Sequence, residues 1–471
     1  MPTYTPTIGL EIHAELATTT KLFCDSKNDP DEKRPNVNVC PVCMGHPGTL
    51  PVLNEEALRH MIRIGLSIGG EIANFTEFDR KNYFYPDIPK GYQISQYKYP
   101  IVSGGMLRGI AVTRVHLEED TARSQHGSKG ESLVDFNRAG VSLMELVTEP
   151  VLHSAEEASA FARELQVLLR TLGASDAQME KGQMRVEANV SVSSTEGFGT
   201  KVEVKNINSF RSVERAIKYE IERQTAVLQA GGSLVQETRG WDEVAQETFS
   251  QRSKEEAKEY RYFPEPDLPK YTLHDLFDLE DIRSDLPELP WVKRDRLKKE
   301  LGFDDSVIEL FVVDGAAASF FERATVDIKA DDRKLQLASN YITSDLAGLL
   351  RASGSTFADL RVDPSDFAAL IELISANKLS SRGAKDILAT MIEEGGSPFE
   401  IAESRGLFQV NDMKQLADIA QSIVDEHPIL ADEYRAGKVQ ALQFFIGQGM
   451  KMTKGSANPK MLEDVFKKIL G

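Results

Sequence analysis

The sequence has little of what would place the chain in a membrane or in an oxidising compartment. Its 471 residues include only three cysteines, too few for a paired disulfide framework, and this favours a reducing compartment. No apolar run approaches the roughly 18 residues that cross a bilayer, and the first residues lack the charged, apolar and small-residue order of a signal peptide. We therefore expect a cytoplasmic protein without a membrane segment.

An excess of positive charge and the familiar nucleotide-binding motifs are also missing. The net charge of −18 argues against a general nucleic-acid binder, which carries a basic footprint. Neither G-x-x-x-x-G-K-[ST] nor a G-x-G-x-x-G after a strand occurs, so a bound nucleotide would occupy an unfamiliar site. No cysteine stands in a recognisable catalytic motif, so a glutaminase-type nucleophile is not evident.

The alternation of apolar and polar residues indicates the fold class. Three segments have the period of a strand, namely residues 8–16, 185–192 and 201–205. Helical periodicity follows Asn54, the capping box that Ser154 makes with Glu157, and Ser212. With 41% hydrophobic and 27% charged residues, the chain can bury a large core. These patterns predict an α+β fold with a mainly antiparallel sheet, one face apolar and the other polar.

Prolines and glycines indicate the domain boundaries. Prolines cluster between residues 264 and 290, and beyond them almost every segment has helical periodicity. Glycines at 395, 396 and 406 indicate a second break. We expect an α+β domain over residues 1–292, an all-helical middle domain over 293–402 and a small helical tail domain over 403–471.

The end of the tail is basic although the whole chain is acidic. From residue 438 to 471, six lysines stand against two acids, which gives this stretch a net charge of +4. Such an end fits local contact with a polyanion, and a solvated lysine-rich helix face explains it equally well.

One stretch, Asp79–Gln96, crowds lysines, aromatic residues, carboxylates and two prolines together. Because Pro86 and Pro89 fix φ and remove backbone donors, we expect a rigid extended loop rather than a helix or strand. Rigid loops on a scaffold often carry binding and catalytic groups. The alternative is a surface loop whose tyrosines only pack.

Several acids share the polar face of the predicted strands. If these strands are neighbours, Glu11, His13, Glu187 and Glu203 project from one surface, and Glu118-Glu119-Asp120 follows another strand. Carboxylates with one imidazole suit Mg²⁺ or a softer cation, and lysines beside them would neutralise phosphate oxygens: Lys81, Lys90 and Lys205. The pattern favours phosphoryl transfer, and the alternative is a solvated sheet face with structural salt bridges.

The cysteines form most of a structural zinc motif. Cys24 precedes the pair Cys40 and Cys43, whereas structural zinc takes four donors. Ser26 stands where a fourth thiolate could be, and Asp25, His46 or water are the other candidates for a fourth ligand. A bound zinc ion and a knuckle that folds without metal both remain open.

The chain resembles the B subunit of the aspartyl/glutamyl-tRNA amidotransferase. The resemblance covers essentially the whole length and rests on long motifs: Leu10–His13, Cys40–Gly48, Asp79–Gln96, His116–Arg123, Tyr260–Asp267 and Lys454–Pro459. It implies an unusual cradle fold for the first domain and a tRNA-binding, YqeY-like tail. It also implies a heterotrimer with an amidase, the A subunit, and with a small C subunit. The family's zinc-bearing members carry four cysteines here, so Ser26 leaves zinc in doubt.

The activity implied by the resemblance is a correction of misacylated tRNA. The B subunit would use ATP and Mg²⁺ to phosphorylate the side-chain carboxylate of Glu-tRNA(Gln) or Asp-tRNA(Asn), and ammonia from the amidase would then displace phosphate. The implied metal ligands are Glu11, His13, Glu119 and Glu203, with Glu187 as a further candidate. The other implied site residues are Lys81 and Lys90 at the activation site and ammonia path, with Glu118 and Lys205 beside them, and Lys451, Lys454 and Lys460 for tRNA. The alternative is a tRNA-binding scaffold without catalysis of its own.

Overall fold

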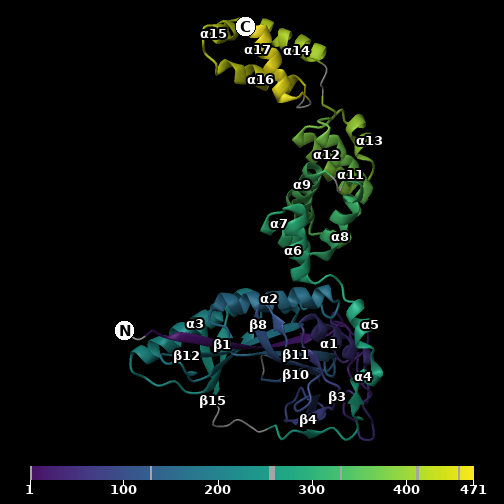
Figure 1. Ribbon diagram of the computed structural model, residues 1–471, viewed down its shortest axis with the longest axis vertical. Coiled ribbons are helices and arrows are strands. Elements are labelled where there is room, and N and C mark those ends of the chain that lie inside the picture. The colour runs from purple at the N-terminus through teal and green to yellow at the C-terminus, as the bar shows by residue number, and fades with distance from the viewer. Residues whose placement is uncertain (1–2, 128–129, 254–259, 329–330, 410–412, 454–456) are drawn as a thin grey trace. The chain divides into compact units, whose positions relative to one another are not determined.

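The computed structural model describes residues 3–127, 130–253, 260–328, 331–409, 413–453 and 457–471 (Figure 1). The chain divides into two compact units, Met1–Pro290 and Trp291–Gly471, so the division falls beside the proline-rich segment. Among the described helices, none is long and apolar enough to span a bilayer.

The first unit is built around one large sheet. Its strands are β1 (Thr5–Glu15), β2 (Glu71–Ile72), β6 (Val102–Ser103), β7 (Met106–Leu107), β8 (Ile110–Glu119), β11 (Ser142–Thr148), β12 (Met184–Ser193), β13 (Val202–Ile207), β14 (Glu237–Asp242) and β15 (Glu247–Ser253). Their order is β15-β14-β13-β12-β1-β11-β8-β6-β2, with β7 also paired to β8. The pairs are antiparallel except β13 with β14, which confirms the predicted α+β fold with a mainly antiparallel sheet.

Helices cover the apolar face of this sheet. The helices of the first unit are α1 (Glu55–Ser67), α2 (Ala155–Thr171), α3 (Phe210–Gln229), α4 (Leu273–Leu276) and α5 (Leu279–Ser284). Figure 1 shows α2 and α3 along one side of the sheet, where α2 contacts β1 and α3 contacts β12. The predicted capping box is present, because Ser154 and Glu157 bond each other's backbone N–H groups at the start of α2. The buried residues of β1 that pack on this side are Ile8, Leu10, Ile12 and Ala14.

The expectation that Asp79–Gln96 is a continuous irregular loop is wrong. Its two ends form antiparallel strands, β4 (Asp79–Asn82) and β5 (Tyr92–Ser95). A third strand, β16 (Phe263–Pro264), comes late in the sequence of this unit and pairs with β4. The prolines lie only in the connection, so strand pairing is free on either side of them. Two further small sheets pair β3 (Phe75–Thr76) with β17 (Tyr271–Thr272) and β9 (Arg123–His126) with β10 (Ser132–Asp135).

The second unit is helical in its described residues. Its helices are α6 (Pro290–Leu301), α7 (Asp305–Val313), α8 (Gly315–Ala324), α9 (Asp332–Asn340), α10 (Ala347–Ser353), α11 (Pro364–Ser375), α12 (Ser381–Glu393), α13 (Pro398–Ser404), α14 (Met413–Glu426), α15 (Pro428–Arg435), α16 (Ala441–Met452) and α17 (Pro459–Leu470). One hydrophobic cluster draws all its buried members from residues 416–470, including Phe445 and Phe466. The tail therefore has a core of its own.

Candidate active site

The register of the central strands gathers polar residues on the face opposite α2. Glu11 of β1 lies opposite Glu187 of β12, and His13 lies opposite Glu145 of β11. Glu145 in turn lies opposite His116 of β8. Because alternate residues of a strand share a face, the apolar residues under α2 leave these polar ones together on the other side.

The first group of this face centres on Glu145, which is buried. The Nε2 atoms of His13 and His116 lie 3.4 and 3.3 Å from the same Glu145 Oε2 atom. The His13 Nε2 atom is also 3.8 Å from Glu118 Oε1 and 3.9 Å from Glu11 Oε1. Three carboxylates thus lie within 3.9 Å of the His13 Nε2 atom, and the His116 imidazole lies as close to two of them.

Burial and mutual repulsion shift the ionisation of this group. Burial and the neighbouring carboxylates of Glu145 and Glu187 raise the pKa of Glu11 to about 7. Burial opposes ionisation of Glu145 too, but the imidazoles of His116 and His13 lower the pKa of that carboxyl far below its usual range. Burial alone would lower the pKa of His13, whereas the hydrogen bond and charge of Glu145 raise it. Glu11 is therefore the acid whose negative charge is least compensated.

A second group lies on the same face and shares Glu11. Its other carboxylates belong to Glu187 and to Glu203 of β13, and the Lys205 Nζ atom lies 2.8 Å from Glu187 Oε2 and 3.5 Å from Glu203 Oε1. Burial alone would lower the pKa of Lys205, but these two acids raise it. The Oδ1 atom of Asn189, which lies opposite Glu203 in the sheet, is buried without a hydrogen-bond partner among the described residues.

Both groups fit a divalent cation. In each of the sets Glu11–His13–Glu145 and Glu11–Glu187–Glu203, one ligand atom per residue lies within 4.8 Å of the others. A third set on the same face joins His116, Glu118 and Glu145. Carboxylate oxygens are the ligands of Mg²⁺, and the imidazoles also admit softer ions. A cation would offset the repulsion that suppresses ionisation of Glu11.

Glu119 lies apart from these sets. No group of potential metal ligands in the described part of the chain includes it. Glu118 and Glu119 alternate along β8, so Glu118 faces the imidazoles while Glu119 accepts hydrogen bonds from Lys90 Nζ (2.6 Å) and from the Ile94 backbone N–H (2.8 Å). Lys81 remains with the first group, since its Nζ atom is 3.7 Å from Glu118 Oε2. The structure thus divides the expected site residues between two neighbouring places.

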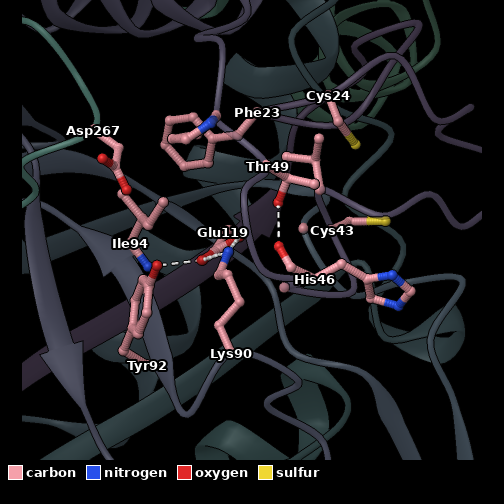
Figure 2. A pocket seen from close by; sticks show the side chains of 14 residues that line it. Phe23, Cys24, Cys43, His46, Thr49, Lys90, Tyr92, Ile94, Glu119 and Asp267 are labelled. Atoms are coloured by element: carbon pink, nitrogen blue, oxygen red, sulfur yellow. Dashed lines mark hydrogen bonds and ion pairs between the residues drawn. The ribbon is translucent and has the colours of Figure 1, made fainter.

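The Lys90–Glu119 pair borders a pocket of about 100 Å³ (Figure 2). Tyr92 and Ile94 line it from β5, and Cys24, Cys43 and His46 line it from the cysteine motif. Lys90 and Glu119 point toward one another in Figure 2. The cysteine motif and the activation lysine predicted from the sequence therefore share one cavity.

The three cysteines lie together, but the chain has no fourth cysteine to complete a structural zinc site. Their Sγ atoms form one group within 4.8 Å, and Ser26 Oγ lies 3.8 Å from Cys43 Sγ. The fully buried Lys21 places its Nζ atom 3.7 Å from the same sulfur. A hydrogen bond from Cys24 lowers the pKa of Cys43 to about 4. The residues present do not fit closed four-donor zinc coordination, because a serine hydroxyl and an ammonium group stand beside Cys43.

The lysines expected to contact tRNA belong to the second unit. Lys451 and Lys460 are exposed, at the end of α16 and the start of α17, whereas Lys454 lies outside the described residues. Their roles stay predictions.

The sequence patterns did not identify two residues of the site, Glu145 and His116, as possible metal ligands. Glu145 is the single acid in the otherwise apolar and hydroxyl-bearing β11, SLMELVT. A lone charge in a buried strand is a signal in itself, because an unpaired buried carboxylate is strongly disfavoured. Only strand register shows which residues are its partners.

Fold and site together define a class: a mainly antiparallel α+β unit with a buried acid and imidazole face, followed by a helical unit. Residues 6–277 match the family model of the GatB/GatE catalytic domain, and residues 319–470 match that of the GatB domain.

Full-length relatives agree with these matches. The B subunit of the aspartyl/glutamyl-tRNA(Asn/Gln) amidotransferase from Synechocystis is 43% identical, over 99% of this chain and 98% of the relative. Proteins of the same name from Persephonella marina (43%) and Thermotoga maritima (42%) each match over 99% of both chains. The chain belongs to the family of B subunits of the aspartyl/glutamyl-tRNA amidotransferase, which confirms the resemblance seen in the sequence. The family supports the enzyme interpretation and nothing in it favours the scaffold alternative.

Proposed function

We propose that this chain activates the side-chain carboxylate of Glu-tRNA(Gln) or Asp-tRNA(Asn) with ATP and then directs ammonia to it. The observation that carries the proposal is the convergence of Glu11, His13 and Glu145. These residues would hold Mg²⁺ together with Glu187 and Glu203, and the cation, when bound, would neutralise phosphate charge. The cytoplasm, where aminoacyl-tRNA is used, would be its place of action.

In the first half-reaction, a carboxylate oxygen of the aminoacyl group attacks the γ-phosphorus of ATP. The bond to the β-phosphate oxygen breaks, giving an acyl phosphate and ADP. Lys81 and Lys205 lie at the two groups of acids, where their ammonium groups can bind phosphate oxygens. The raised pKa values of both lysines keep them protonated for this role.

In the second half-reaction, ammonia attacks the acyl carbon, the carbon–oxygen bond to phosphate breaks, and the nitrogen loses a proton as the amide forms. Ammonia must arrive unprotonated, so its path should exclude bulk water. The Lys90–Glu119 pair and its pocket are our candidate for that path. An amidase partner, the A subunit, would release the ammonia from glutamine, and a small C subunit would complete the heterotrimer.

Reconstitution tests the proposal directly. The chain is assembled with its amidase and small C partners and given ATP, Mg²⁺, glutamine and each misacylated tRNA, and the amide formed on tRNA is measured. Glu145→Gln should abolish ATP-dependent amide formation while tRNA binding persists. Glu71→Gln, an exposed acid on the edge strand β2 of the same sheet, is the matched control. Full activity of Glu145→Gln would instead favour the scaffold interpretation.

A further inference from the structure

Four tyrosine rings, two of them exposed and two half-buried, lie next to the acid and imidazole group centred on Glu145. Tyr97 stacks on Tyr262 with ring centroids 4.4 Å apart and planes 11° apart, and the Tyr97 residue is 65% exposed. Tyr260 meets Tyr262 at 6.1 Å and Tyr83 at 5.6 Å, both edge to face. Because Tyr262 covers one face of the Tyr97 ring, the exposed part of Tyr97 includes its outer face. We name these four residues the tyrosine patch.

The fold fixes this patch in place. β16 pairs with β4, and the side chain and backbone of Asn82 in β4 donate hydrogen bonds to the Tyr260 and Arg261 carbonyls. Arg261, between the two tyrosines, has a φ of 43°, a conformation that costs energy in a residue with a side chain. The segment 260–262, held in this way, presents two tyrosine rings and the exposed Arg261 close together.

The patch leads directly to the activating groups. Lys81 Nζ lies 5.2 Å from the centroid of the Tyr260 ring and 3.7 Å from Glu118 Oε2. Burial, opposed by the charge of Lys81, raises the pKa of Tyr262 to about 12, and Glu118 and Glu145 act in the same direction as burial. A ligand whose ring stacks on the tyrosines therefore has the part attached to that ring beside Lys81.

We propose that the tyrosine patch stacks the unpaired terminal base of the aminoacyl-tRNA and so positions the esterified amino acid at Lys81 and Glu118. This inference rests on the proposed function. Single-stranded nucleic-acid ends are bound by stacking on aromatic rings beside cationic groups, and Arg261 supplies a cation for the phosphate. The openness of the patch favours a strand end over a free nucleotide, whose base usually enters a concave pocket.

Tyr97 is the residue to test, because it is exposed and contacts the reacting groups only through its neighbours. In the assembled three-subunit enzyme, Tyr97→Leu should raise KM for aminoacyl-tRNA about tenfold and leave kcat and the KM for ATP unchanged. Tenfold corresponds to about 1.4 kcal/mol, within the range of one base on one ring. Tyr97→Trp retains a stacking surface and should restore the wild-type KM. Phe198→Leu removes an exposed aromatic ring elsewhere and should have no effect.

A binding measurement separates this inference from the proposed function. The terminal base of the tRNA is replaced by 2-aminopurine, whose fluorescence should be quenched on the wild-type complex and on Tyr97→Trp but not on Tyr97→Leu. An unchanged KM for tRNA and unchanged quenching in a folded Tyr97→Leu enzyme would overturn the inference. A rise in the KM for ATP instead would assign the patch to the adenine of ATP and overturn it as well. Absence of amide product in the wild type would count against the proposed function alone.

Discussion

At the scale of single residues, Glu11 carries the electrostatic conflict of the site. Its carboxyl is shared by both candidate cation groups, and burial with Glu145 and Glu187 raises its pKa to about 7 from 4.5. In the unfolded chain this acid ionises at the lower pH, so the folded state holds more protons between these values. Stability therefore falls as pH rises through that window, and the full penalty is present above pH 7.

Glu11→Gln should remove this penalty. At pH 8 in a chelator, we expect the variant to melt several degrees above the wild type, for a gain on the order of 2 kcal/mol. Near pH 4.5 the difference should vanish. Added Mg²⁺ should raise the melting temperature of the wild type and not of Glu11→Gln, because binding to the folded state stabilises it. Thermal melts across pH, with Glu71→Gln as the control, decide the matter; equal melting temperatures at pH 8 would contradict the assigned repulsion.

How much of the site could be predicted from sequence depends on the kind of signal each residue carries. Strand alternation predicts that four residues share the polar face, because every second side chain of a strand points to the same side: Glu11, His13, Glu187 and Glu203. Alternation does not predict which residues contact one another, because that depends on which strands are neighbours. Glu119 illustrates this: it is adjacent in sequence to Glu118 and points to a different place.

At the scale of elements, capped and periodic segments were predictable and the proline-rich stretch was not. The starts of α1 and α2 follow from local capping at Asn54 and Ser154. β4 and β5 are four residues each, and β4 gains its second partner, β16, from a segment about 180 positions away. No local pattern indicates such a partner.

A charge pair attaches β16 to β4. Glu265, whose side chain is fully buried, accepts two hydrogen bonds of 2.7 Å from Arg80, and the Arg80 guanidinium also lies 4.3 Å from the centroid of Tyr92. Glu265→Gln leaves this cation without its main partner. We expect a loss of about 2 kcal/mol in the free energy of unfolding, below the usual range of about 3–5 kcal/mol for a broken buried pair, because Asp267 still lies 3.2 Å from Arg80.

Denaturant unfolding of the full chain measures this loss. Glu280→Gln is the matched control, since its pair with Arg283 is exposed and worth little. If Glu265→Gln unfolded at the same denaturant concentration as the wild type, the pair would not be what fixes β16 to β4.

At the scale of the whole molecule, the chemistry and the lysine contacts to the body of the tRNA are expected in different units. The two groups of acids on the sheet face belong entirely to residues before Pro290, whereas Lys451 and Lys460 follow it. The tail is also set off within the second unit, because its hydrophobic cluster draws on residues 416–470 alone. An acidic chain with a basic end can thus attract a polyanion at that end.

Removal of the tail tests this division of labour. The cut belongs after Gln409 and not at the glycine of position 406, because the Gln409 N–H bonds the Lys378 carbonyl and Phe408 bridges to Leu379. In the assembled enzyme, loss of residues 410–471 should raise the KM for tRNA and make binding less salt-dependent, since fewer phosphates are neutralised. The rate at saturating tRNA, with ammonia supplied directly, should stay near that of the full chain. If the tail lysines only form a solvent-exposed helix face, both the KM for tRNA and the salt dependence of binding will stay unchanged. A large fall in the rate at saturating tRNA would instead place part of the chemistry in the tail.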